Sequence, residues 1–168
     1  MRTRVDADEV AKRLAARFLE PEICRAGAAA LPSRPTPDEV GCCEMAFART
    51  AVVRHVVADV LPASLAETIN AVMMRELAGA FGGAHTAATE AHYGSRTLAE
   101  VAADAMSVYQ PAAFFATRVA DTMMTRLGMA RVGLAKLTLP ARPPAALVAV
   151  FTDLTEEVVL FLARARMI

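Results

Sequence analysis

Titratable side chains gather outside any helical pattern at one place in the sequence, the segment 82–96. His85, Glu90, His92 and Tyr93 lie there. Such groups could bind a metal ion or transfer protons, and the segment could also serve as the lid of a ligand site. His85 and His92 are the candidate metal ligands, but no third ligand is suitably spaced to complete a site. We therefore expect solvated histidines here, and the sequence assigns no metal, cofactor or catalytic residue.

Two other groups of reactive side chains fall within an expected helix. His55 and Asp59 are four residues apart, which permits a histidine–carboxylate hydrogen bond or a phosphotransfer histidine. An exposed helical pair is the simpler interpretation. Cys42 and Cys43 are adjacent, so they point about 100° apart on a helix and cannot hold one metal ion together. We interpret both thiols as small buried hydrophobic groups.

Nine methionines are unusual for a chain of this length, and two pairs of them fall on similar helices. Thioethers bind Cu(I), fill irregular cores, and also form adaptable surfaces for partner helices. Core packing and a partner groove both remain open, and the groove hypothesis adds a rim of nearby arginines. Its predicted interaction residues are Met73, Met74, Met123, Met124, Arg75, Arg118 and Arg126.

Helix-start signals and apolar spacing indicate an all-helical chain. Thr36 to Glu39 gives the clearest start, with a threonine cap, a proline at the first helical position and a glutamate three residues after the cap. Residues 21–35 contain three prolines and predict a connection, with room for one short helical turn. Thr86 to Ala91 could form a short helix, and 129–139 could be a short helix or an extended edge. The long helices are expected over 6–20, 36–61, 64–81, 97–110, 112–127 and 144–166.

The last helix, Pro144 to Arg166, is apolar on more than one side. Leu147, Phe151 and Leu154 begin a stripe that Val148 and others extend around the helix. We therefore expect this C-terminal helix to be the buried centre of the fold. The fold prediction is one all-α domain over 1–168, a bundle of about six to eight helices, with 82–96 and 128–144 irregular.

Composition excludes several partners. The formal net charge is zero, which argues against nucleic acid or an acidic membrane as the main partner. Asp153, Glu156 and Glu157 interrupt the most apolar helix, so no membrane span is expected. Three cysteines, two of them adjacent, form a poor disulfide framework and indicate a reducing compartment. We therefore expect an intracellular protein.

Three functional classes follow from these observations. The first is a non-enzymatic helical interaction module that presents an apolar, methionine-containing groove or face to a protein partner or to a second copy. The second is a small-molecule or metal sensor that uses 82–96. The third is an enzyme of a class that no motif reveals. The helix number and the proline-rich connection resemble the outline of Bcl-2-type proteins. The signature of that family is absent, however, because His92 to Arg96 is a poor substitute for it. We favour the interaction module.

Overall fold

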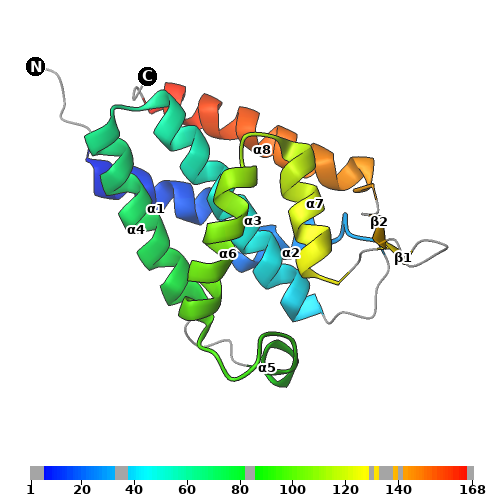
Figure 1. Ribbon diagram of the computed structural model, residues 1–168. Helices are drawn as coiled ribbons and strands as arrows, with labels where there is room; N and C mark the ends of the chain where they lie inside the picture. The colour runs from blue at the N-terminus through cyan, green and yellow to red at the C-terminus, as the bar shows by residue number, and fades with distance from the viewer. Residues whose placement is uncertain are drawn as a thin grey trace, which may run out of the picture.

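The computed structural model describes residues 6–32, 38–81, 86–128, 131–132, 138–139 and 142–165. The prediction of an all-α bundle is confirmed, and the helices pack on one hydrophobic core cluster (Figure 1). Within the described ranges there are eight helices and two very short strands. Their bounds are α1 Ala7–Phe18, α2 Pro21–Ala28, α3 Asp38–Val60, α4 Ala63–Phe81, α5 Ala87–Tyr93, α6 Leu98–Ala112, α7 Ala116–Arg126, β1 Arg131–Val132, β2 Thr138–Leu139 and α8 Ala145–Arg164.

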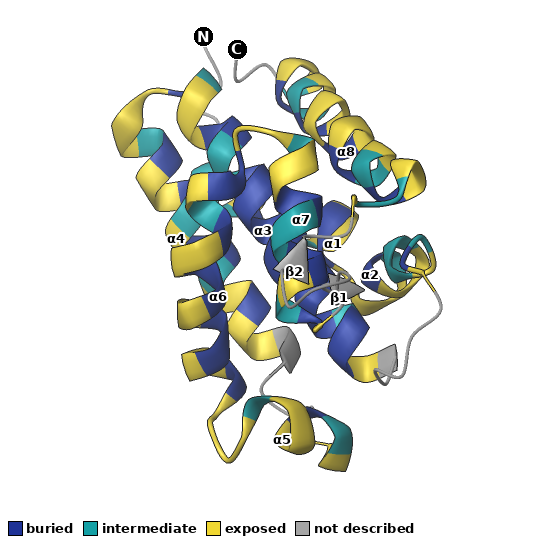
Figure 2. Cartoon of the chain, turned by 45° about the vertical axis from the view of Figure 1, so that its right-hand side comes forward, coloured by how far each residue is buried: buried dark blue, intermediate teal, exposed yellow. Residues whose placement is uncertain are grey.

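The helix at the centre of the bundle is α3, not α8. Six other helices pack against it, namely α2, α4, α5, α6, α7 and α8. From Val40 to Val57 nearly every residue of α3 is buried, on all sides of the helix (Figure 2). By contrast, α8 buries one stripe that includes Leu147, Phe151 and Leu154, and its other side faces solvent. The expectation that α8 is the central helix is therefore wrong, although its predicted stripe does enter the core.

The connection predicted over 21–35 contains a helix. Pro21 ends α1 and also stands at the first position of α2, where a missing backbone N–H costs nothing. The alanine-rich sequence that follows sustains two turns, and α2 packs against α3 through the buried Cys24. The predicted threonine cap at Thr36 lies outside the described residues.

The later helices largely begin and end where local signals place them. The capping box at Thr97 is present, with Glu100 accepting hydrogen bonds from both the Thr97 amide and its hydroxyl. Pro111 lies in the last turn of α6, and a tight turn then leads into α7. The short helix expected near Thr86 forms as α5. The described part of 129–139 is extended, because β1 and β2 pair antiparallel.

Among the residues that the structure describes, no helix is both long enough and apolar enough to span a bilayer.

Candidate functional site

The most elaborate polar cluster surrounds a buried carboxylate in the middle of the bundle. Glu44 lies on α3 and its side chain is fully buried. Its Oε1 accepts hydrogen bonds from the Tyr93 hydroxyl at 2.8 Å and from Arg126 Nη2 at 2.9 Å. Its Oε2 accepts from the Tyr109 hydroxyl and from Arg126 Nε, each at 2.7 Å. We call Glu44, Tyr93, Tyr109 and Arg126 the Glu44 cluster.

This cluster joins four helices through one side chain. Tyr93 ends α5, Tyr109 lies on α6 and Arg126 ends α7, so each of these helices is tied to α3. The Arg126 guanidinium also lies 5.7 Å from the centre of the Tyr109 ring. A carboxylate offers about four acceptor positions, and the four hydrogen bonds occupy them. Glu44 therefore has no free lone pair with which to act as a general base. The cluster stabilises the fold by holding α5, α6 and α7 to α3.

The electrostatics of the cluster agree with that role. Burial raises the pKa of Tyr93 well above its usual range, and the charge and hydrogen bond of Glu44 raise it further. The same causes in the same order raise the pKa of Tyr109. Burial alone would lower the pKa of Arg126, but the hydrogen bonds and charge of Glu44 outweigh burial and raise it. Both tyrosines therefore stay protonated donors, and the arginine stays charged.

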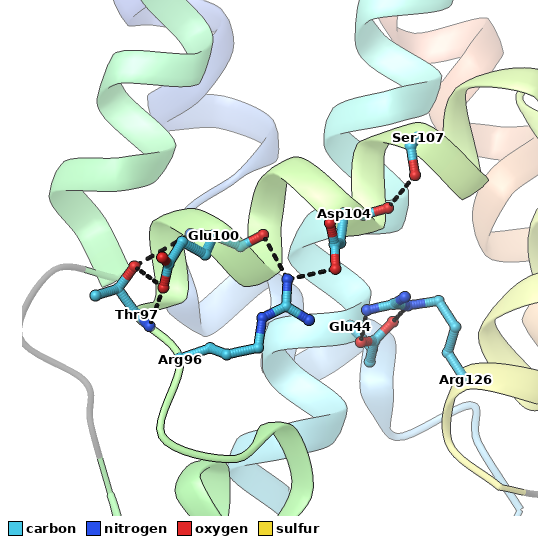
Figure 3. Close-up of polar contacts among 7 residues, drawn as sticks. All are labelled: Glu44, Arg96, Thr97, Glu100, Asp104, Ser107 and Arg126. Carbon is cyan, nitrogen blue, oxygen red and sulfur yellow. Dashed lines mark hydrogen bonds and ion pairs between the residues drawn. The ribbon is translucent and has the colours of Figure 1, made fainter.

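A polar hollow opens beside the cluster. Figure 3 shows the side chains of Arg96 and Asp104 from its lining, near the pair Glu44 and Arg126. Arg96 forms an ion pair with Asp104 and donates to the Glu100 carbonyl at 3.3 Å. His92 Nε2 lies 3.2 Å from the Arg126 carbonyl oxygen. Because Arg96 and Arg126 are each paired with an acid, the hollow presents no free cation to a ligand. Its volume is about 250 Å³, and its lining residues are His92, Tyr93, Arg96, Val101, Asp104 and Arg126.

The predicted reactive residues do not assemble into a catalytic site in the described structure. His85 lies outside the described residues, and no group of three or more potential ligands that could hold a metal ion occurs among the described ones. His55 makes no ion pair with Asp59 there; its ring instead lies 4.4 Å from that of Phe114, centre to centre. Of the described part of 82–96, His92, Tyr93 and Arg96 line the polar hollow, and the sensor hypothesis for this segment stays a prediction.

The cysteines are packing groups. Cys24 and Cys43 are buried free thiols, and burial raises the pKa of each to about 12. Cys42 is half-buried, donates to the Pro21 carbonyl at 3.5 Å, and also has a pKa raised by burial. Raised pKa values disfavour the thiolate, so none of the three is placed for nucleophilic chemistry.

The four predicted interaction methionines do not form a groove. Met73 and Met123 are fully buried and Met124 is only 5% exposed, so these side chains belong to the core. Met74 is half-buried, with its sulfur 3.7 Å from Nη1 of Arg54. The helices that carry them are also separated, because α6 packs against both α4 and α7. Three of the four methionines thus pack in the core, and the two pairs do not form the predicted contact surface.

The three predicted rim arginines lie in different places. Arg75 is exposed and lies 3.7 Å from Asp8 in an ion pair. Arg126 belongs to the Glu44 cluster. Arg118 is exposed, with its guanidinium 5.6 Å from the centre of the Phe115 ring. Of the three, only Arg118 borders an exposed apolar surface.

That surface, which we call the aromatic patch, is formed by Phe114 and Phe115 in the turn between α6 and α7, and Val108 is exposed on the preceding helix α6. Phe114 is 67% exposed, Phe115 61% and Val108 47%. The helix expected over 112–127 includes both phenylalanines, so the sequence did not indicate that they lie in an exposed turn. The available signal was Pro111 shortly before them, because a proline near a helix end favours a turn, and turns lie at the surface.

A second surface feature, which we call the α8 groove, runs between α8 and the pair α1 and α2. One hollow of about 430 Å³ lies between α1 and the end of α8, and another of about 460 Å³ lies between α2 and the first half of α8. Arg17 and Glu157 line both, so the two hollows lie next to each other along α8. The sequence places Arg13 and Arg17 in the first expected helix, over 6–20, but it could not show that α8 lies opposite them.

Comparisons with protein-family models, with curated proteins and with solved structures found no match. The function therefore has to be argued from the aromatic patch, the Glu44 cluster and the α8 groove.

Proposed function

We propose that this protein is a helical protein–protein interaction module whose contact surface is the aromatic patch. The observation that carries the proposal is the pair Phe114 and Phe115, adjacent in sequence and each more than 60% exposed. Large aromatic side chains are enriched at protein interfaces, and contiguous exposed apolar surface commonly marks a binding site.

The surroundings of the patch also suit an interface. The His55 ring lies against that of Phe114, which restricts its motion before a partner arrives. A side chain that is already held loses less conformational entropy on binding. Arg118 lies beside Phe115 and supplies charge at the edge, where interfaces are usually polar.

The partner that we propose for this patch is a second copy of the chain. A patch of one chemical kind can match itself across a two-fold axis, which is the commonest symmetry of soluble oligomers. The formal net charge is zero, so little long-range repulsion opposes the approach of two copies. All acceptor positions of Glu44 are occupied by hydrogen bonds, which supports a binding role for the protein over a catalytic one.

The oligomeric state tests this proposal. Sedimentation of the full chain over a range of concentrations should show a mass that rises from 17.8 kDa toward twice that value. Replacing Phe114 and Phe115 together by serine should keep the protein monomeric and helical. Leu160→Ser is the matched control, because Leu160 is a similarly exposed apolar side chain at 53% and lies in the α8 groove. A chain that stays monomeric throughout, or a double variant that still associates, would contradict the proposal.

A further inference from the structure

The two hollows of the α8 groove together are long enough to accept a helix of about four turns. The groove follows α8 from Val150 to Ala165, which corresponds to about 22 Å or four helical turns at the standard rise. Its opposite wall is formed first by α2 and then by α1. The groove shares no residue with the aromatic patch, so its function is a separate question.

Positive charge lines the groove and has no ion-pair partner in the structure. Arg13, Arg17 and Arg164 are exposed along it, and none of them forms an ion pair with any residue that the structure describes. The acidic residues of the groove are Asp153 and Glu157, and neither is within ion-pair distance of an arginine in the described ranges. Arg13 and Arg17 lie over the rings of Phe161 and Phe18, but none of these guanidinium groups has an anionic partner among the described residues.

A further arginine is buried at the floor of the groove. Arg49 is 8% exposed, and its Nε donates to the Phe18 carbonyl at 2.7 Å. No carboxylate among the described residues lies within ion-pair distance of it, and Glu157 acts on it only from farther away. A buried cation without a paired anion is costly, because it has lost hydration and gained no compensating charge. An incoming carboxylate would supply that charge.

Apolar side chains lie among these arginines. Leu160 is 53% exposed and Phe161 is half-buried, with the Arg13 guanidinium 5.7 Å from the centre of its ring. Ile23 and Val150 are half-buried at the other end of the groove. A ligand that fits the whole groove therefore has both an apolar face and several anionic groups.

We propose that the α8 groove binds an acidic amphipathic helix of a partner protein. Leucine-like side chains of that helix would pack on Leu160, Phe161 and Val150, and carboxylates at its edges would pair with the arginines of the walls. One carboxylate would reach Arg49. Helix-in-groove recognition uses this combination of a spaced apolar face with complementary charge at the rim.

Designed peptides provide the probe. The first is a fluorescent helical peptide of about 15 residues, matched to the length of the groove, with leucine at helical spacing and glutamate beside it. The second carries lysine in place of each glutamate, and the third is a scrambled form of the first. Fluorescence anisotropy with the full chain should show saturable binding of the acidic peptide alone, weakening as salt is raised.

Charge reversal locates the binding. Replacing Arg17 and Arg164 together by glutamate should weaken binding of the acidic peptide at least about tenfold, because attraction becomes like-charge repulsion. The matched control reverses Arg25 and Arg142, which are also exposed but do not line the groove. Arg25→Glu with Arg142→Glu changes the net charge equally and should leave binding unchanged. Circular dichroism should show that both double variants remain folded.

Several outcomes would overturn the inference. The lysine or scrambled peptide could bind as tightly as the acidic one, or the control variant could weaken binding as much as the groove variant. Displacement of the peptide by inorganic phosphate at similar concentrations would reveal a simple anion site. Loss of self-association on reversal of Arg17 and Arg164 would make the groove an interface between copies. None of these results depends on whether the aromatic patch forms a dimer.

Discussion

The tyrosine residues illustrate how one buried carboxylate governs the chemistry of its neighbours. Tyr93 and Tyr109 are the only tyrosines in the chain, and both donate to Glu44. Burial, and then the adjacent negative charge, makes loss of the phenolic proton unfavourable in the folded state. An ionised Tyr93 or Tyr109 would face Glu44 with a second negative charge and no hydrogen to donate.

Alkaline titration should therefore detect the cluster. The folded pKa of each tyrosine lies above the unfolded value of about 10, so the stabilising contribution is fully present below about pH 10. Above that pH the unfolded chain releases its protons first, and the free energy of unfolding should fall as the pH rises. In absorbance measurements the folded protein should develop no tyrosinate band near pH 11, roughly one unit above the ordinary pKa, where the urea-unfolded chain shows both tyrosines ionised.

Glu44→Gln separates the two causes in the same titration. The substitution removes the negative charge but keeps a side chain of nearly equal size. The tyrosines of a folded variant should then ionise at lower pH than in the wild type, though still above their usual value because burial remains. Ordinary titration of both tyrosines in the folded wild-type protein would contradict the buried cluster.

At the scale of elements, sequence patterns identified the helices that bury one face. They also predicted the helix α3, but not that it is buried on all sides. The stripe of α8 was predictable, because Leu147, Phe151 and Leu154 recur at helical spacing. In α3 the apolar pattern is interrupted by Glu44, Arg49 and Thr50, residue types that are usually exposed.

All three polar residues of α3 are in fact buried with partners. Thr50 Oγ1 donates to the Ala46 carbonyl of its own helix at 2.7 Å, whereas Arg49 and Glu44 find partners far away in the sequence. A local pattern cannot reveal such partners, so the sequence could not show that these polar residues are buried.

Close packing around α3 predicts different effects of enlarging two of its alanines. Ala51 is fully buried, and Ala58 lies on the same helix but is exposed. Ala51→Leu should destabilise the fold by about 1–3 kcal/mol, because a filled core admits extra methylene groups only by shifting its neighbours. Ala58→Leu should change the free energy of unfolding by less than about 0.5 kcal/mol. Urea unfolding measures both, and equal effects would show that α3 is not enclosed.

At the scale of the molecule, both proposed surfaces depend on contacts between segments that are distant in the chain. The residues of the aromatic patch are close in sequence, but the ring of Phe114 lies next to that of His55 near the end of α3. The α8 groove sets Arg13 and Arg17 from the beginning of the chain against α8 at its end. The sequence contains these arginines and phenylalanines, but only the fold shows which of them line the groove and which form the patch.

Because the patch and the groove share no residue, we expect them to act independently. Replacing Phe114 and Phe115 by serine should leave the affinity for the acidic peptide within about twofold, and reversing Arg17 and Arg164 should leave the dimerisation constant within the same margin. Sites without common partners usually contribute additively, to within about 0.5 kcal/mol, which corresponds to that factor. Anisotropy on the wild type and the phenylalanine variant, together with sedimentation on the wild type and the arginine variant, gives the four values needed. If bound peptide instead weakens self-association by tenfold or more, the two surfaces are coupled. The helix that would couple them is α8, because it packs on α7 next to the aromatic patch and also forms one wall of the groove.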